Sequence, residues 1–227
     1  MRVADIVDAG ERRRTAGLFA GGVGIDAQLQ GITAGVGGDT VVNLLRRVDD
    51  VLDEHEPDAM FVMVGGNDNV SYSQPATRGY YRKSKQLEKG YITPDEHAAA
   101  YRDLLTRISL AYVQPLVGLS PAEYSRALVA SRAEFTQRAR DVAEALNVPV
   151  LDLDAVFTPD EPIEREPVNI HFISQIGARS ATDWDDFEAE RQKWGYTYTF
   201  DGMHILPETA PQFADHIVPF LREHLRL

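Results

Sequence analysis

The sequence of 227 residues contains no cysteine, only two tryptophans and no long uninterrupted apolar run. Without cysteine, neither disulfides nor thiolate nucleophiles and metal ligands are available. No apolar stretch reaches the ~18 residues expected of a membrane-spanning helix, and the first residues, Met1 to Asp5, do not begin a signal peptide. We therefore expect a cytoplasmic protein that does not enter a membrane.

Positive charge is also scarce. The chain has 23 lysines and arginines against 35 aspartates and glutamates, a net charge of -12. A negative protein repels phosphate backbones and anionic membrane surfaces. The composition therefore argues against nucleic acid or a membrane as the partner.

A linker is missing as well, so we expect one domain over residues 1–227. Strand-like apolar runs alternate with helical patterns, which predicts an α/β fold with a parallel sheet covered on both faces. The expected strands are a short one within residues 1–8 and others at 25–33, 60–64, 113–119 and 148–153, with 148–153 at an edge because of Pro149. The expected helices are a brief one at 15–21 and longer ones starting at Val41, at Pro94, at Ser120 (as N-cap, reaching Asn147) and near the C-terminus.

The run at 60–64 is apolar enough for a strand buried on both faces, and Gly65-Gly66-Asn67-Asp68 ends it abruptly. Ligands bind at the carboxyl edge of open parallel sheets. The Asn67 amide is well suited there to donate to an oxyanion. An alternative remains open, in which Asn67 and Asp68 only cap the turn or the next helix.

A second polar turn, Gly35 to Thr40, lies between an expected strand and a helix. It matches neither the phosphate-loop pattern nor the dinucleotide fingerprint. The backbone N–H of Gly38 can point into a site, or the turn can serve only to cap the helix through Asp39 or Thr40. Both interpretations stay open.

A third turn carries Asp201-Gly202-Met203-His204. A carboxylate three residues before a histidine can accept the Nδ1 proton and leave Nε2 facing outward, as the orienting group and the base of an acyl-transfer site do. The alternative is a surface histidine before a helix. Asp152 and Asp154 are spaced like paired ligands, but no third ligand lies near them, so we predict neither a metal site nor a cofactor.

Two segments are long and irregular. Residues 70–93 are basic and rich in tyrosine. Residues 157–195 follow the last expected strand and end in a charged amphipathic helix expected at 184–194. Each can be a lid or substrate-entry segment, or else a solvated surface insertion.

Taken together, the three polar turns resemble blocks II, III and V of the SGNH (GDSL-type) hydrolase family, in order and at plausible spacing. The resemblance implies a flavodoxin-like three-layer α/β/α sandwich with a five-stranded parallel sheet in the order 2-1-3-4-5. It implies Gly38 and Asn67 as oxyanion donors, His204 as general base and Asp201 as its orienter. The implied substrate is a small acyl or acetyl ester.

The first block departs from the family pattern. Ala4-Asp5-Ile6-Val7 resembles Gly-Asp-Ser-Ile with the nucleophilic serine deleted or replaced by Ile6, so that Asp5 is a first-block remnant. Either the given chain lacks an N-terminal piece or the gene has lost the nucleophile. Two hypotheses follow: an ester hydrolase, or a catalytically impaired relative that binds a small molecule or carbohydrate. No pattern predicts the oligomeric state.

Overall fold

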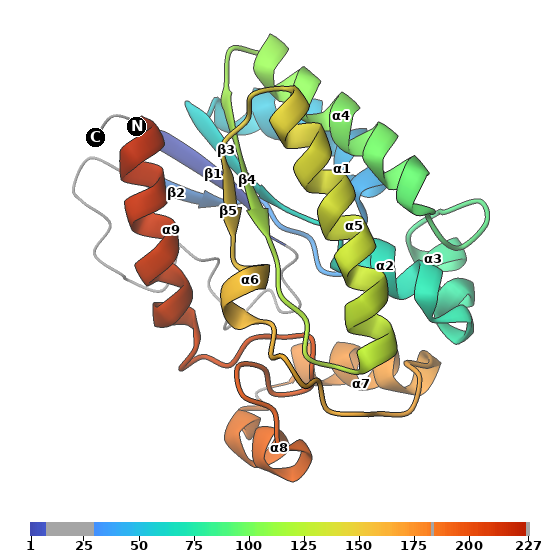
Figure 1. Ribbon diagram of the computed structural model, residues 1–227. Helices are drawn as coiled ribbons and strands as arrows, with labels where there is room; N and C mark the ends of the chain where they lie inside the picture. The colour runs from blue at the N-terminus through green and yellow to red at the C-terminus, as the bar shows by residue number, and fades with distance from the viewer. Residues whose placement is uncertain (8–29, 183, 226–227) are drawn as a thin grey trace.

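The structure is a computed structural model that describes residues 1–7, 30–182 and 184–225. Its sheet has five parallel strands in the order β2-β1-β3-β4-β5 (Figure 1). The strands are β1 (Arg2–Val7), β2 (Gln30–Thr33), β3 (Ala59–Met63), β4 (Gln114–Leu119) and β5 (Val150–Asp152). The predicted fold class and strand order are therefore confirmed, including the edge position of the last strand.

Helices cover both faces of this sheet. They are α1 (Val41–His55), α2 (Gly66–Ser73), the 3₁₀ turn η1 (Pro75–Thr77), α3 (Arg78–Ser84), α4 (Pro94–Leu110), α5 (Arg126–Ala145), α6 (Asp154–Phe157), α7 (Ile170–Ser180), α8 (Phe187–Trp194) and α9 (Ala210–Leu225). Helices α1, α4 and α5 lie on one face and α9 on the other, whereas α2, α3, α7 and α8 gather beyond the carboxyl ends of the strands (Figure 1). None of the helices in the described ranges combines the length and apolarity needed to cross a membrane.

The central strand β3 explains why the layers form. All five of its residues are buried, and it pairs with β1 on one side and β4 on the other. Because side chains alternate along a strand, Met60 and Val62 join the apolar cluster beneath α1, α4 and α5. Phe61 and Met63 join the cluster beneath α9. A continuous apolar run is the pattern of a strand covered on both faces.

The predicted strand boundaries are correct to within two residues where the chain is described. The exception is 25–33, of which only β2 lies in the described ranges, and the brief helix expected at 15–21 lies outside them. Asp5 lies within β1, where its Cα is paired with Thr33 on β2 and with Phe61 on β3. Its backbone is therefore part of the sheet.

The helix expected to start at Ser120 begins later. Its N-cap is Ser125, whose Oγ accepts from the N–H of Leu128, so the prediction of Ser120 as the cap was wrong. A capping box at Ser120 would need Glu123 to turn back onto the Ser120 backbone. The Glu123 carboxylate is instead bound to a distant loop, which belongs to the site described next.

Candidate active site

The loop before α9 brings an aspartate and a histidine together. Asp201 is only 2% exposed, and its Oδ2 lies 2.8 Å from Nδ1 of His204. Its Oδ1 accepts from the backbone N–H groups of Met203 and His204, at 3.0 and 2.9 Å. The carboxylate accepts the proton on Nδ1, so in the neutral ring the lone pair is on Nε2. This nitrogen is the one suited to take a proton from a reacting group.

The Asp201 carboxylate is kept ionised. Burial by itself raises its pKa. The charge of a protonated His204 ring and the hydrogen bonds from His204 and Met203 lower the pKa by more than burial raises it, so the pKa of Asp201 falls below its ordinary value of 3.8. At neutral pH the buried carboxyl therefore carries the charge that can stabilise an imidazolium beside it.

The Asp201 loop is itself held by a second buried carboxylate. Glu123, from the segment between β4 and α5, accepts from the backbone N–H groups of Thr197, Tyr198 and Thr199 at 3.0, 3.0 and 2.8 Å. It also accepts from Oγ1 of Thr199 at 2.6 Å. The Glu123 N–H donates to the carbonyl of Gly202 at 3.1 Å. Glu123 thus ties together both sides of the turn that carries Asp201.

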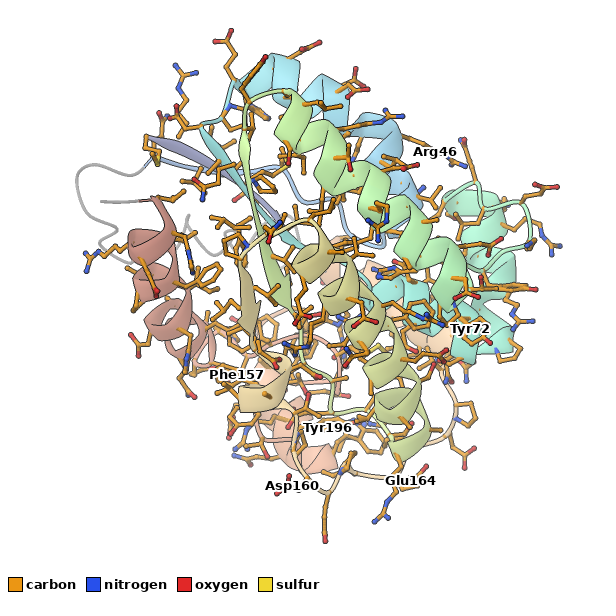
Figure 2. The ribbon with its side chains drawn as sticks, turned by 45° about the horizontal axis from the view of Figure 1, so that its top comes forward. Arg46, Tyr72, Phe157, Asp160, Glu164 and Tyr196 are labelled. Atoms are coloured by element: carbon orange, nitrogen blue, oxygen red, sulfur yellow. The ribbon has the colours of Figure 1, made fainter. Side chains whose placement is uncertain are left out.

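Part of the segment 157–195 packs beside the same turn. The guanidinium of Arg165 lies 3.5 Å from the ring centre of Trp194 and donates to the Tyr196 hydroxyl at 2.9 Å. Tyr196 and the nearby Glu164 lie at the end of the molecule where α5 begins (Figure 2). Burial raises the pKa of the Tyr196 hydroxyl, and a Cβ at Gly202 would lie 2.7 Å from that hydroxyl. A lid or entry role for 157–195 stays a prediction.

Asn67 lies in the first turn of α2, directly beyond the buried strand β3. Helix α2 begins after Gly65, whose φ of 131° is a backbone conformation that other residues rarely adopt. The Tyr81 hydroxyl donates to Oδ1 of Asn67 at 2.6 Å. With its oxygen engaged in this way, the amide directs its Nδ2 group to the opposite side.

Asp68 caps neither its own turn nor the helix that follows, because the N-cap of α2 is Gly65, and its carboxylate instead reaches the start of α1. Both Asp68 oxygens lie near the N–H of Val41, at 3.0 and 3.3 Å, so Asp68 accepts from the first N–H of α1, whose N-cap residue is Thr40. Its Oδ1 also lies 3.0 Å from Nδ1 of His97 on α4, and both side chains are buried. Asp68 therefore ties α2 to α1 and α4, which is a structural role.

The Gly38 turn closes against α3. Gly38 has a φ of 78°, and a Cβ there would meet the Tyr80 hydroxyl and Cε of Lys85, each at 2.8 Å. The cap of α1 is Thr40, whose N–H donates to Oδ1 of Asn43 at 3.1 Å. Asp39 is not the cap and instead pairs with Lys85 at 3.0 Å.

Packing connects the His204 loop with the Asn67 helix. Met203, next to His204, packs against the cluster that includes Val70 on α2, Tyr81 on α3 and Tyr124. The segment 70–93 therefore contributes buried residues to this edge of the sheet. Its predicted role as a lid or insertion remains a prediction.

A separate cavity of about 260 Å³ lies between α1 and the end of α3. Its lining residues are Val36, Asp39, Asn43, Arg46, Arg47, Ser84, Lys85 and Gln86, so it contains neither Asn67 nor His204. Across the described ranges, no cluster of three or more histidine, aspartate or glutamate side chains is arranged to hold a metal ion. Asp152 and Asp154 instead bind Arg140 and Thr158.

The model of the GDSL-like lipase/acylhydrolase family matches residues 5–208, which is most of the chain. The chain belongs to this family. Membership in the GDSL-like family supports ester hydrolysis as the class of reaction, and it confirms the resemblance noted in the three turns.

Solved structures of esterases share the fold of this GDSL-like protein. The acetyl xylan esterase AlAXEase aligns with a TM-score of 0.62 and 15% identity, over 96% of this chain and 98% of its own. Axe2, an acetylxylan esterase from Geobacillus stearothermophilus, aligns with a TM-score of 0.63 and 15% identity, over 97% of this chain and 93% of its own. The esterase EstA from Pseudoalteromonas sp. aligns with a TM-score of 0.57 and 13% identity, over 100% of this chain and 99% of its own. At such identities the likeness concerns the fold alone. A comparison with curated proteins found no match.

Sequence reasoning missed three residues of this GDSL-like site region: Glu123, Tyr81 and His97. Only His97 had a local signal, because it lies four residues before the buried Tyr101 on one face of α4. The family match begins at Asp5, and the residues that follow β1, 8–29, lie outside the described ranges. The role of Asp5 as a first-block remnant therefore stays a prediction.

Proposed function

We propose that this protein hydrolyses small carboxylic esters, acetyl esters among them, with an oxyanion hole and a histidine–aspartate pair. The observation that carries the proposal is the contact of 2.8 Å between the buried Asp201 carboxylate and His204 in a GDSL-like fold. A surface histidine before a helix has no need of a buried carboxylate on its Nδ1. Acetyl ester substrates are also named for two of the structural relatives.

In the proposed reaction the ester carbonyl oxygen receives hydrogen bonds from the Gly38 N–H and from Nδ2 of Asn67. These donors stabilise the negative charge that develops when the carbonyl carbon is attacked. Nε2 of His204 removes the proton of the attacking group and later returns it to the alcohol that leaves. Asp201 holds the ring and stabilises the imidazolium formed between these two steps.

The missing serine decides what attacks. No Gly-Asp-Ser precedes Ile6, so we propose that His204 activates a water molecule directly in the given chain. Oxyanion stabilisation and binding without the full triad typically retain an acceleration of ~10³–10⁴ over the reaction in water. The given chain is therefore expected to be a poor esterase.

The missing serine also supports a second candidate function, which is binding without catalysis. A relative without its nucleophile can retain the pocket to bind a small molecule or a carbohydrate. The retained Asp201–His204 pair favours the esterase, since a binding pocket needs no oriented base. A cytoplasmic location and the absence of nucleic acid and membrane partners remain predictions.

The test is hydrolysis of p-nitrophenyl acetate by four proteins: the given chain, a chain rebuilt with Gly-Asp-Ser ahead of Ile6, and each of these with His204→Ala. We expect weak turnover by the given chain and a steep, His204-dependent gain in the rebuilt one. Strong His204-dependent turnover by the given chain would show that another residue is the nucleophile. A folded but inactive rebuilt chain would favour the binding function.

A further inference from the structure

Helix α3 touches both candidate oxyanion donors through one of its faces. Tyr81 contacts Asn67, and Lys85, four residues later at the end of the helix, contacts the Gly37–Gly38 turn. Residues four apart lie on the same face of a helix. A single short element thus reaches two turns that follow different strands.

Tyr81 holds the Asn67 amide in one of its two orientations. A side-chain amide can turn over and exchange its oxygen with its nitrogen, and its hydrogen-bond partners decide which orientation is kept. The Tyr81 hydroxyl donates to Oδ1 at 2.6 Å. The Tyr81 side chain is fully buried and its ring packs edge-on against Tyr80, with 5.1 Å between ring centres. Its hydroxyl is therefore fixed in place behind the amide.

Lys85 does the same for a backbone amide. Its Nζ donates to the carbonyl oxygen of Gly37 at 2.7 Å. This carbonyl and the Gly38 N–H belong to one planar peptide group, and no peptide bond in the described ranges is cis. In a trans peptide the C=O and the N–H point in opposite directions. A donor on the Gly37 oxygen therefore turns the Gly38 N–H away from Lys85.

Lys85 is itself fixed by two further contacts. Its ammonium pairs with Asp39 at 3.0 Å, and its carbonyl accepts from Nδ2 of Asn43 on α1 at 2.7 Å. A hydrogen bond to the oxygen of an amide also polarises its N–H, because linked hydrogen bonds strengthen one another. The contact of Tyr81 with Asn67 and that of Lys85 with Gly37 thus each set the direction of an N–H donor and can strengthen it.

We propose that Tyr81 and Lys85 are positioning residues that aim the two oxyanion donors. Each residue donates a hydrogen bond to the oxygen of the amide group whose N–H is the donor: Tyr81 to the side-chain amide of Asn67, and Lys85 to the Gly37–Gly38 peptide. This inference rests on the proposed function, because it assigns Asn67 and Gly38 to the oxyanion. It also gives α3 a role different from that of a lid, since its contacts lie behind the donors.

The kinetic test uses p-nitrophenyl acetate hydrolysis by the rebuilt chain. Tyr81→Phe removes only the hydroxyl, and Lys85→Met removes the ammonium while it keeps an unbranched, flexible side chain. Donors that act on the transition state affect kcat more than KM, and losing a whole oxyanion donor costs about 10²–10³ in kcat. We expect each variant to lower kcat by about 10- to 100-fold with little change in KM, and Lys85→Arg to restore most of the loss.

Matched controls are available in the same segment. Tyr91→Phe and Lys83→Met make the same chemical changes at residues that contact neither donor, and both should retain the parent kcat. Since Tyr81 acts through Asn67, the double variant Tyr81→Phe/Asn67→Ala should be no slower than Asn67→Ala alone. Additive losses, or losses in KM only, would overturn the inference.

A second readout needs no turnover. In ¹⁵N NMR spectra, Tyr81→Phe should move the side-chain Nδ2 signals of Asn67, and Lys85→Met should move the backbone signal of Gly38, both by more than the matched controls do. Unchanged signals would overturn the positioning roles. If every protein is inactive and these signals still move, the esterase proposal fails and the positioning geometry stands.

Discussion

Replacing Glu123 with glutamine tests whether one buried carboxylate holds the turn that carries Asp201. One oxygen of Glu123 accepts from the N–H of Thr197, and the other accepts from three groups, the N–H of Tyr198 and both the N–H and Oγ1 of Thr199. Glutamine has a single oxygen. If that oxygen keeps the three donors, its Nε2 group faces the Thr197 N–H, so that two donors meet.

The cost follows from that geometry. A buried donor left without an acceptor costs about 1–3 kcal/mol, and bonds to a charged acceptor are stronger than neutral ones. We expect Glu123→Gln to lower the free energy of unfolding by roughly 2–4 kcal/mol. Urea denaturation followed by circular dichroism measures this value. The same turn carries His204, so kcat for p-nitrophenyl acetate should fall as well.

Glu164→Gln is the matched control, because Glu164 is an exposed carboxylate at the same end of the molecule (Figure 2). It should change the free energy of unfolding by less than about 0.5 kcal/mol. A Glu123→Gln protein as stable as the parent, with the parent's kcat, would refute the reasoning that this carboxylate organises the turn.

Two further predictions concern the buried carboxylates of Asp201 and Asp68. The pKa of Asp201 lies below 3.8 in the folded protein, so its ionised form stabilises the fold above that pH and the contribution is lost as the pH falls through the folded pKa. Asp201→Asn should therefore lower the free energy of unfolding by roughly 1–3 kcal/mol at pH 7 and by less at pH 3; equal differences at the two pH values would contradict this. Asp68→Ala removes the acceptor of Val41 and His97 and should lower the same free energy by about 2–4 kcal/mol. A loss below 1 kcal/mol in urea denaturation would show that Asp68 is not a structural tie.

Local patterns in the sequence predicted the sheet because they report burial directly. The run at 60–64 is apolar at every position, and such a run forms a strand covered on both faces. The glycines after it end the strand and Pro94 begins α4, and both effects depend only on the local backbone preferences of these residues. The three polar turns could be predicted for the same reason.

The contacts that organise the turns were beyond such reasoning. Tyr81 reaches Asn67 across 14 residues, Asp68 reaches Val41 across 27, and Glu123 reaches Thr197 across 74. Periodicity compares residues only a few positions apart, so it carries no information on these pairs. The error at Ser120 has this origin, because the glutamate of an apparent capping box is used by a distant loop.

On the prediction that Ala4-Asp5-Ile6 is the first block, the pairing of β1 with a strand on each side separates the two ways in which its serine could have been lost. Val3 belongs to the cluster under α9 and Ala4 to the cluster on the opposite face. Loss or gain of one residue within a strand moves every residue on one side of the change to the other face. A deletion would therefore have altered the core as well as the chemistry, whereas a replacement leaves the pairing intact. Restoration of the serine by Ile6→Ser, which keeps Ala4 opposite Met60, is accordingly the companion to the inserted Gly-Asp-Ser.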